Sequence, residues 1–157
     1  MSTSVVPPVI TVAYVDAVFA KLDAVYGNAL RSMAASRLVT QGAIGDVYAI
    51  FTQRLAPTAI QALGSLKASN FRNLRADPGD QHTHVDKLLF ASNRCIFARV
   101  TVDYSGVDVH APPPPFAQYE ALTSREPINV REGDPTAWAI FYDNVLLKRQ
   151  DVRDPCG

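Results

Sequence analysis

The sequence has no excess of charge of either sign and no long apolar run. Among its 157 residues, 15 Lys and Arg are balanced by 15 Asp and Glu. A protein that binds nucleic acid by neutralising phosphates needs a basic surplus, so no nucleic-acid partner is expected. The longest stretch without a charged residue, residues 1–15, is too short to span a bilayer and is interrupted by Pro7 and Pro8. No membrane span is therefore expected.

Residues 1–15 also lack the basic residues of an export leader. This favours a cytoplasmic protein if Met1 is the native start. The alternative is an extracytoplasmic protein from which a leader was removed.

Cysteine is scarce, which excludes a cysteine-rich zinc site. Cys95 and Cys156 are the two cysteines, 61 positions apart. Two interpretations stay open. Free thiols would suit a reducing compartment, whereas a Cys95–Cys156 disulfide would fasten the C-terminal end and favour an exported domain.

What is present is enough apolar material for one core. The hydrophobic class makes up 48% of the chain and charged residues 19%. We expect a single domain over residues 1–157, with a flexible arm at 1–10, a helical part at 11–75, a sheet part at 81–150 and a tail at 151–157.

The helical part carries apolar residues at a period of 3.6. After a possible cap at Thr11 or Asp16, the first helix has a long apolar stripe, and Asp16 and Asp23 lie off it. The stripe consists of Val15, Val18, Phe19, Leu22, Val25, Tyr26, Leu30 and Met33. We expect a second helix to start at Asp46 and to be stopped by Pro57, and a third to be capped by Thr58.

After residue 80 the period changes to 2, which predicts strands at 81–92, 95–104, 116–123 and 136–147. Short links between successive strands favour antiparallel pairing. The four prolines at 112–115 predict a stiff connector between two of the strands. The fold class is therefore α+β, with N-terminal helices packed on an antiparallel sheet of four or more strands.

This order of elements resembles the nuclear transport factor 2-like superfamily, the cystatin-like α+β cone, including its exported actinobacterial members. The stretch Trp138-Ala139-Ile140-Phe141-Tyr142-Asp143 is similar to a Trp-x-Ile-x-Tyr-Asp pattern on a late strand of such domains, and Asp103-Tyr104-Ser105 fits the same picture. The resemblance covers roughly residues 11–150. It implies that the sheet is curved, that a conical cavity lies between the first helix and the sheet, and that a homodimer pairs through the open sheet.

On that cone, the expected ligand-binding residues come from the first helix and two strands. They are Phe19, Tyr26, Val100, Tyr104, Trp138, Ile140 and Tyr142. For catalysis we expect Asp86 as the base and Tyr104 or Tyr142 as the proton donor. Asp103 and Asp143 neighbour those tyrosines, so alternation along the strand should turn them outward.

Two histidines, His82 and His84, share a strand face with Asp86. A His-x-His pair can bind a metal, but no third ligand follows, so we expect a solvated strand face, no metal and no cofactor. The sequence favours a non-catalytic domain that binds a small apolar molecule or a protein. The alternatives are an isomerase, cyclase or dehydratase of the ketosteroid isomerase or polyketide cyclase type, and an accessory domain of a cell-envelope or secretion assembly.

Overall fold

In the part of the chain that the structure describes, three helices precede a four-stranded antiparallel sheet. The computed structural model describes residues 2–110, 116–125 and 133–157. The helices are α1 (Val12–Ser36), α2 (Gln41–Ile50) and α3 (Ala56–Ala68), and the strands are β1 (His82–Ala91), β2 (Cys95–Asp103), β3 (Gln118–Ser124) and β4 (Trp138–Asp143). The predicted α+β class and its order are confirmed. The proline connector, residues 111–115, lies outside the described residues.

Helix α1 begins where the sequence predicts. The hydroxyl of Thr11 accepts a hydrogen bond from the backbone N–H of Tyr14 at 3.1 Å, so Thr11 is the cap. The predicted stripe is largely buried, and Val15, Val18 and Met33 are fully enclosed.

The predicted boundaries of α2 and α3 are wrong. Helix α2 is capped by Thr40 rather than started at Asp46, and it contains Gly42 and Gly45. Pro57 does not stop α2 but lies in the first turn of α3, where its missing N–H costs nothing. The capping hydroxyl of Thr40 favours a helix here more strongly than Gly42 and Gly45 disfavour it.

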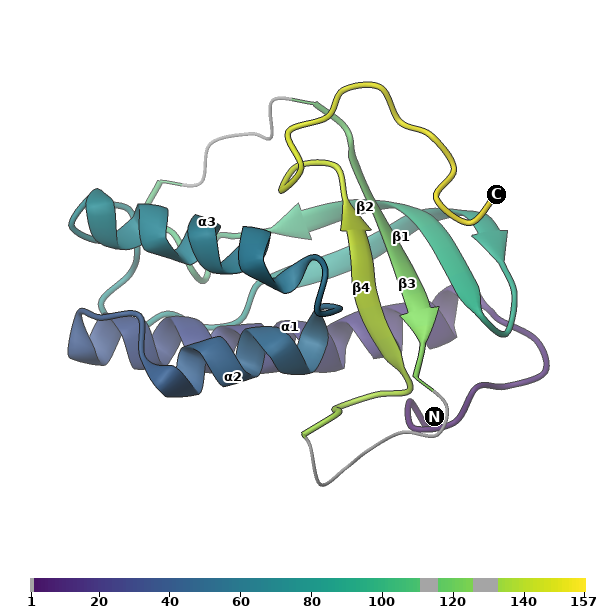
Figure 1. The fold of residues 1–157 in the computed structure, drawn as a ribbon, viewed down its shortest axis with the longest axis horizontal. Helices are drawn as coiled ribbons and strands as arrows, with labels where there is room; N and C mark the ends of the chain where they lie inside the picture. The colour runs from purple at the N-terminus through teal and green to yellow at the C-terminus, as the bar shows by residue number, and fades with distance from the viewer. Residues whose placement is uncertain (1, 111–115, 126–132) are drawn as a thin grey trace.

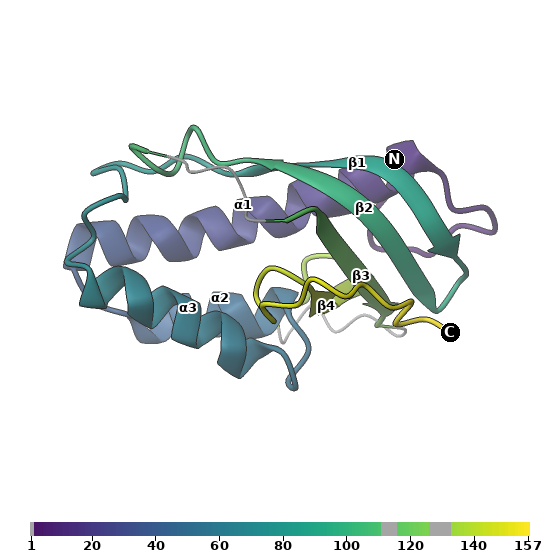
Figure 2. The same ribbon diagram turned by 90° about the horizontal axis from the view of Figure 1, so that it is seen from above.

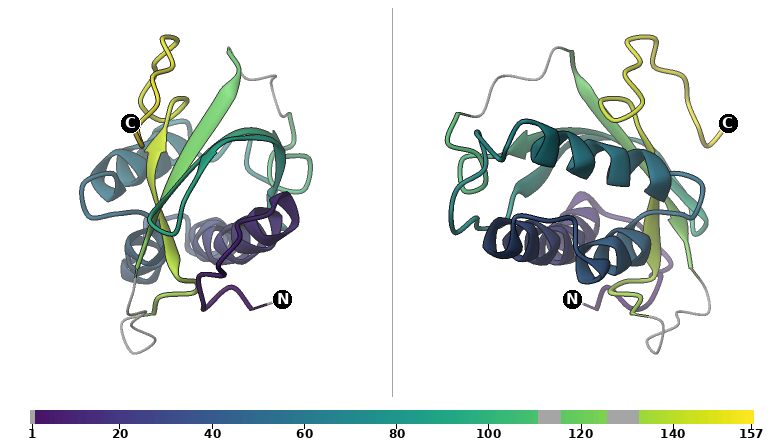
Figure 3. Two further views of the ribbon diagram at one scale, coloured as in Figure 1. Left: turned by 90° about the vertical axis from the view of Figure 1, so that its right-hand side faces the viewer. Right: turned by 60° about the vertical axis from the view of Figure 1, so that its left-hand side comes forward.

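The sheet has the strand order β1-β2-β3-β4. It is strongly twisted: in Figure 1, β1 and β2 run across the view while β3 and β4 cross it steeply. Figure 2 shows α1 beside β1 and β2, with α2 and α3 on the side of β4. The two views of Figure 3 show the sheet bending around the helices, so its inner face covers them.

The inner and outer faces of β2 follow the predicted alternation. Ile96, Ala98 and Val100 pack in the main core with the helices, whereas Phe97 lies on the outer face. There it packs with Ala121 and Tyr142 in a second, smaller cluster.

Three bulges break this alternation elsewhere. In β1, Asp86 and Leu89 have no partner in the ladder with β2. In β4, Phe141 is skipped, because Leu122 pairs with Ile140 while Ala121 pairs with Tyr142. One extra residue reverses the faces of all that follow it, so Ile140 is inside, Tyr142 outside and Asp143 inside again.

The chain's ends are fastened to the sheet. A disulfide joins Cys95 to Cys156, which settles the two interpretations in favour of the bond. Val152 and Cys156 of the C-terminal segment pack on the outer cluster. At the other end, the carbonyl of Thr3 accepts a hydrogen bond from the N–H of Ala137 at 2.9 Å. Over the described residues, no helix combines the length and hydrophobicity needed to cross a bilayer.

Candidate functional site

A cavity of about 240 Å³ lies between α1, the inner face of the sheet and the loops that follow β2 and β4. Apolar side chains from α1 and β4, such as Phe19, Leu30 and Ile140, form much of its wall. The polar lining residues are Asp23, Tyr26, Gln81, Tyr104, Asp108, Gln118, Glu120 and Asp143. Four of these eight are acidic, so the wall carries more than the tyrosine hydroxyls that the sequence predicts on an otherwise apolar surface.

Two of the acids form a pair. Glu120 of β3 and Asp143 of β4 are direct cross-strand partners on the inner face, and their side chains are hydrogen-bonded to each other. Their exposed fractions are only 5% and 6%. Two buried carboxyl groups in contact cannot both be charged without a large cost, so they share a proton.

The hydrogen bonds decide where that proton lies. One carboxylate oxygen of Asp143, Oδ1, accepts from the backbone N–H groups of Val145 and Leu146, each at 2.9 Å, and its side chain also bonds to Gln118. Glu120 has Asp143 as its side-chain partner. Bonds from N–H donors favour the charged form, so Asp143 is the carboxylate and Glu120 carries the proton.

Burial dominates the titration of both groups. It raises the pKa of Glu120 well above 4.5, and the nearby negative charges of Asp143 and Asp23 raise it further. Burial also raises the pKa of Asp143, while the bonds from Leu146 and Val145 oppose that rise. Glu120 therefore keeps its proton to a higher pH than an exposed glutamate does.

Two tyrosines face this pair. The side chain of Gln118 is hydrogen-bonded both to Tyr104 and to Asp143, which links the Tyr104 hydroxyl to the acid pair. Burial raises the pKa of Tyr104, and Glu120 and Asp143 add to the rise. Burial likewise raises the pKa of Tyr26 to about 12. Both phenols therefore stay protonated and can donate hydrogen bonds.

Asp23 lies on α1, at the opposite wall, with an exposed fraction of 5%. Its carboxylate accepts from the N–H of Thr83 at 2.7 Å, from the Thr83 hydroxyl at 2.9 Å and from Gln81 at 3.2 Å. Burial still raises the pKa of Asp23 above its ordinary value. The prediction that Asp23 lies off the buried face of the helix is wrong, because β1 supplies polar partners there.

Four of the predicted site residues line the cavity: Phe19, Tyr26, Tyr104 and Ile140. Val100 and Trp138 are on the inner face but belong to the solid core. The indole N–H of Trp138 donates to the hydroxyl of Tyr14 at 2.8 Å.

The predicted orientations of Asp86, Tyr142 and Asp143 are wrong. Asp86 is an exposed bulge residue that accepts a hydrogen bond from the Thr101 hydroxyl at 2.7 Å, so it cannot serve the cavity. Tyr142 is on the outer face, and its buried hydroxyl has no hydrogen-bond partner among the described residues. Asp143, expected outside, is in the cavity because of the bulge at Phe141.

The histidines of β1 are on the exposed face, as predicted. Within residues 2–110, 116–125 and 133–157, no group of three His, Cys, Asp or Glu side chains could hold a metal ion.

Glu120 and Gln118 were missed by the sequence interpretation. A signal was available, since both alternate with Leu122 on one face of a strand, and polar residues facing a core are exceptional.

Comparisons of the chain with models of protein families, with curated proteins and with solved structures find no match.

Proposed function

We propose that the protein is a cofactor-free acid–base enzyme, an isomerase, cyclase or dehydratase acting on a small hydrophobic molecule. The observation that supports this most is the Glu120–Asp143 pair, buried at the wall of a cavity. General acid–base catalysis needs a group whose pKa is moved toward neutrality, and burial in an apolar wall does that. The catalytic base in this proposal is therefore the acid pair, and no longer Asp86, which the sequence suggested.

In this proposal the residues have distinct roles. Asp143 takes a proton from the substrate. Glu120 either donates the shared proton in a hydrogen bond to Asp143 or gives that proton up and carries the negative charge itself. Tyr104, linked to Asp143 through Gln118, donates a hydrogen bond to the oxygen on which charge develops. The apolar wall holds the substrate and limits the access of water.

The size and setting of the cavity fit a small molecule. Its volume is slightly below the roughly 300–1,000 Å³ of pockets that take drug-sized ligands. The order of helices and strands is compatible with a nuclear transport factor 2-like cone, and we keep that superfamily as part of the proposal.

A generic substrate tests the proposal without knowledge of the natural one. Nitrobenzisoxazole loses its ring C–H proton to a base, and the C–H electrons form a nitrile as the N–O bond breaks to release a phenolate. We expect turnover above the rate in buffer. Asp143→Asn should lower that turnover by about 100-fold or more, the range typical of a lost general base.

Matched controls separate the pair from the rest of the molecule. Asp86→Asn removes an exposed acid, and Tyr142→Phe removes a phenol outside the cavity. Both should leave turnover unchanged, whereas Tyr104→Phe should lower it. Equal turnover in the wild type and in Asp143→Asn would refute the catalytic role of the pair.

A second candidate is binding of a small apolar molecule without turnover. It is favoured by the several hydrogen bonds to Asp143, because they stabilise the charged carboxylate and make it a weaker base. Saturable binding of the probe without turnover would select it.

The Cys95–Cys156 disulfide supports the third reading, an accessory domain of an exported assembly. The homodimer also stays a prediction. Native mass spectrometry of protein purified from its source would report subunit number and any retained ligand or partner together.

A further inference from the structure

The charges around the cavity are all of one sign. Asp23 of α1, Glu120 of β3, Asp143 of β4 and Asp108 of the loop after β2 all line it. No Lys, Arg or His is among the described lining residues. The other titratable lining groups are the phenols of Tyr26 and Tyr104.

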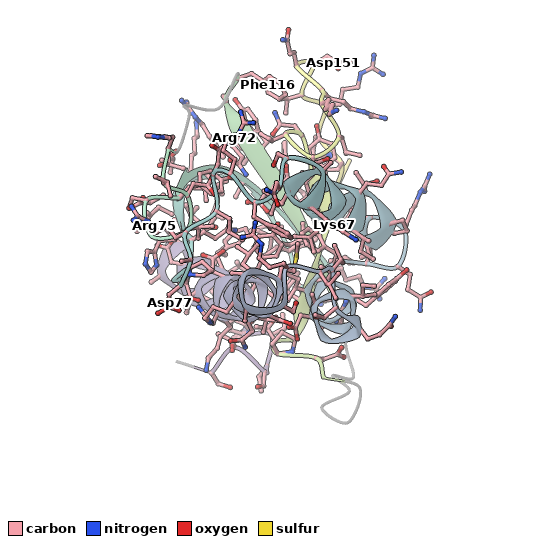
Figure 4. The ribbon with its side chains drawn as sticks, turned by 90° about the vertical axis from the view of Figure 1, so that its left-hand side faces the viewer. Lys67, Arg72, Arg75, Asp77, Phe116 and Asp151 are labelled. Carbon is pink, nitrogen blue, oxygen red and sulfur yellow. A yellow bond between two sulfur atoms is a disulfide. The ribbon has the colours of Figure 1, made fainter. Side chains whose placement is uncertain are left out.

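In the described part of the chain these acids form no ion pair with a cationic side chain, although the imidazole of His82, exposed on β1, is near enough for its charge to lower the pKa of Asp23. The ion pairs found there join Arg31 to Asp80, Arg125 to Asp134 and Arg153 to Asp151, none of which is a cavity acid. The basic side chains at the helical end, Lys67, Arg72 and Arg75, are exposed on the outside of the molecule (Figure 4).

A buried carboxylate without a cation is unusual, because charge taken out of water is normally paired. With one proton shared, the Glu120–Asp143 pair keeps one negative charge beside an open volume of about 240 Å³. Asp23 is near enough to raise the pKa of Glu120 by its charge. A carboxylate or phosphate ligand would meet repulsion from both walls, whereas a cation would supply the missing partner.

We infer that the cavity selects small, mainly apolar molecules that carry an amine, with the ammonium group against the Glu120–Asp143 pair, and rejects carboxylates. This inference deepens the proposed function and rests on it, because it names the substrate class of the same site. The apolar wall of Phe19, Leu30 and Ile140 takes the hydrocarbon part, and the hydroxyls of Tyr26 and Tyr104 can orient the polar end.

Three probes of nearly equal shape test the inference: benzylamine, benzyl alcohol and benzoate. Titration calorimetry on the full chain at neutral pH should show benzylamine binding at least ten times more tightly than benzyl alcohol. Benzoate should bind more weakly than the alcohol. Equal binding of the amine and the alcohol, or tighter binding of benzoate, would overturn the inference.

Variants locate the charge. Glu120→Gln keeps one negative charge in the pair and should retain the amine preference. Asp143→Asn removes a charge that raises the pKa of Glu120, so Glu120 can take over the negative charge in that variant. The double variant Glu120→Gln/Asp143→Asn leaves a neutral pair, so benzylamine should fall to the affinity of benzyl alcohol, while Asp86→Asn should behave as the wild type. An unchanged preference in the folded double variant would overturn the assignment. If that variant does not fold, the wild-type ratios decide.

The two proposals fail separately. Turnover of the neutral nitrobenzisoxazole with no amine preference would overturn the substrate class alone. An amine preference without turnover would overturn the catalytic proposal alone.

Discussion

Glu120 is the single residue on which the chemistry of the site depends most. It is a carboxyl group on the inner face of β3, almost fully enclosed, and its side chain bonds to another acid. In this position an ionised glutamate would be costly, so the folded state favours the protonated form. That preference links proton binding to folding.

Stability should therefore depend on pH through Glu120. Its pKa is raised in the folded state above the ordinary 4.5, so its contribution is fully present below pH 4.5 and is lost as the pH rises through the raised value. Glu120→Gln should flatten this part of the profile, and the variant should be at least as stable as the wild type at neutral pH. Urea unfolding across a pH series measures the free energy of unfolding of both proteins. Parallel profiles for the two proteins would contradict the assignment.

Gly27 of α1 is required by a close approach. A Cβ atom there would lie 2.0 Å from Oδ1 of Asp80, the atom that pairs with Arg31 at 2.9 Å. Gly45 of α2, by contrast, has open space around it. Gly45→Ala should stabilise the protein by about 0.5–1 kcal/mol through helix propensity.

Gly27→Ala should give none of that gain, because the added methyl group displaces Asp80 and breaks the ion pair. Thermal unfolding of the two variants side by side tests this. An equal gain at both positions would show that Asp80 moves away without cost.

At the level of elements, bulges decided what the sequence could predict about the site. Strand β2 has none, and its faces follow the alternation of apolar and polar residues. In β4 the skipped residue Phe141 reverses the faces, which puts Tyr142 outside the site and Asp143 inside it. In β1 Asp86 is itself one of two skipped residues, and it is exposed like His82 and His84. The local sequence around Phe141 carries no glycine or proline that would have announced the bulge.

The outer edge of β1 is closed by acids of α1. The N–H groups of Thr83 and Val85 donate to Asp23 and Asp16, at 2.7 and 2.8 Å. Edge strands need such protection, since their free N–H groups can pair with another chain. The sequence pattern shows where the strand lies but not which helix lies beside it, so these contacts could not be predicted.

Asp16→Ala should destabilise the protein by about 1–3 kcal/mol, because it leaves the partly buried N–H of Val85 unpaired. Asp86→Ala, which removes an exposed acid from the same strand, is the control and should cost less than about 0.5 kcal/mol. Denaturant unfolding compares the two. A similar, small effect of both would show that water replaces Asp16 readily.

For the whole molecule, composition and periodicity were enough to predict the class. The helical half, the four strands and their antiparallel pairing followed from the change of period near residue 80. The contact between the two acids could not be predicted in this way, because it depends on the register between β3 and β4, which local patterns do not encode.

The disulfide holds the C-terminal segment on the outer face of the sheet. It closes a loop across 61 positions, and loop-closure entropy for that length corresponds to up to about 4 kcal/mol. Reduction, or Cys156→Ser, should lower the free energy of unfolding by a few kcal/mol and expose the cluster of Phe97 and Tyr142. Denaturant unfolding with and without a reductant measures it. A midpoint unaffected by reductant would mean that the segment adds nothing to stability.

The central claim is that a buried carboxyl group keeps its proton at neutral pH. Infrared spectroscopy detects it directly, because a protonated carboxyl group has a carbonyl stretch that a carboxylate lacks. We predict that this band is present in the wild type at pH 7, disappears in Glu120→Gln and persists in Asp86→Asn. A wild-type spectrum without a protonated carboxyl band at that pH would contradict the account.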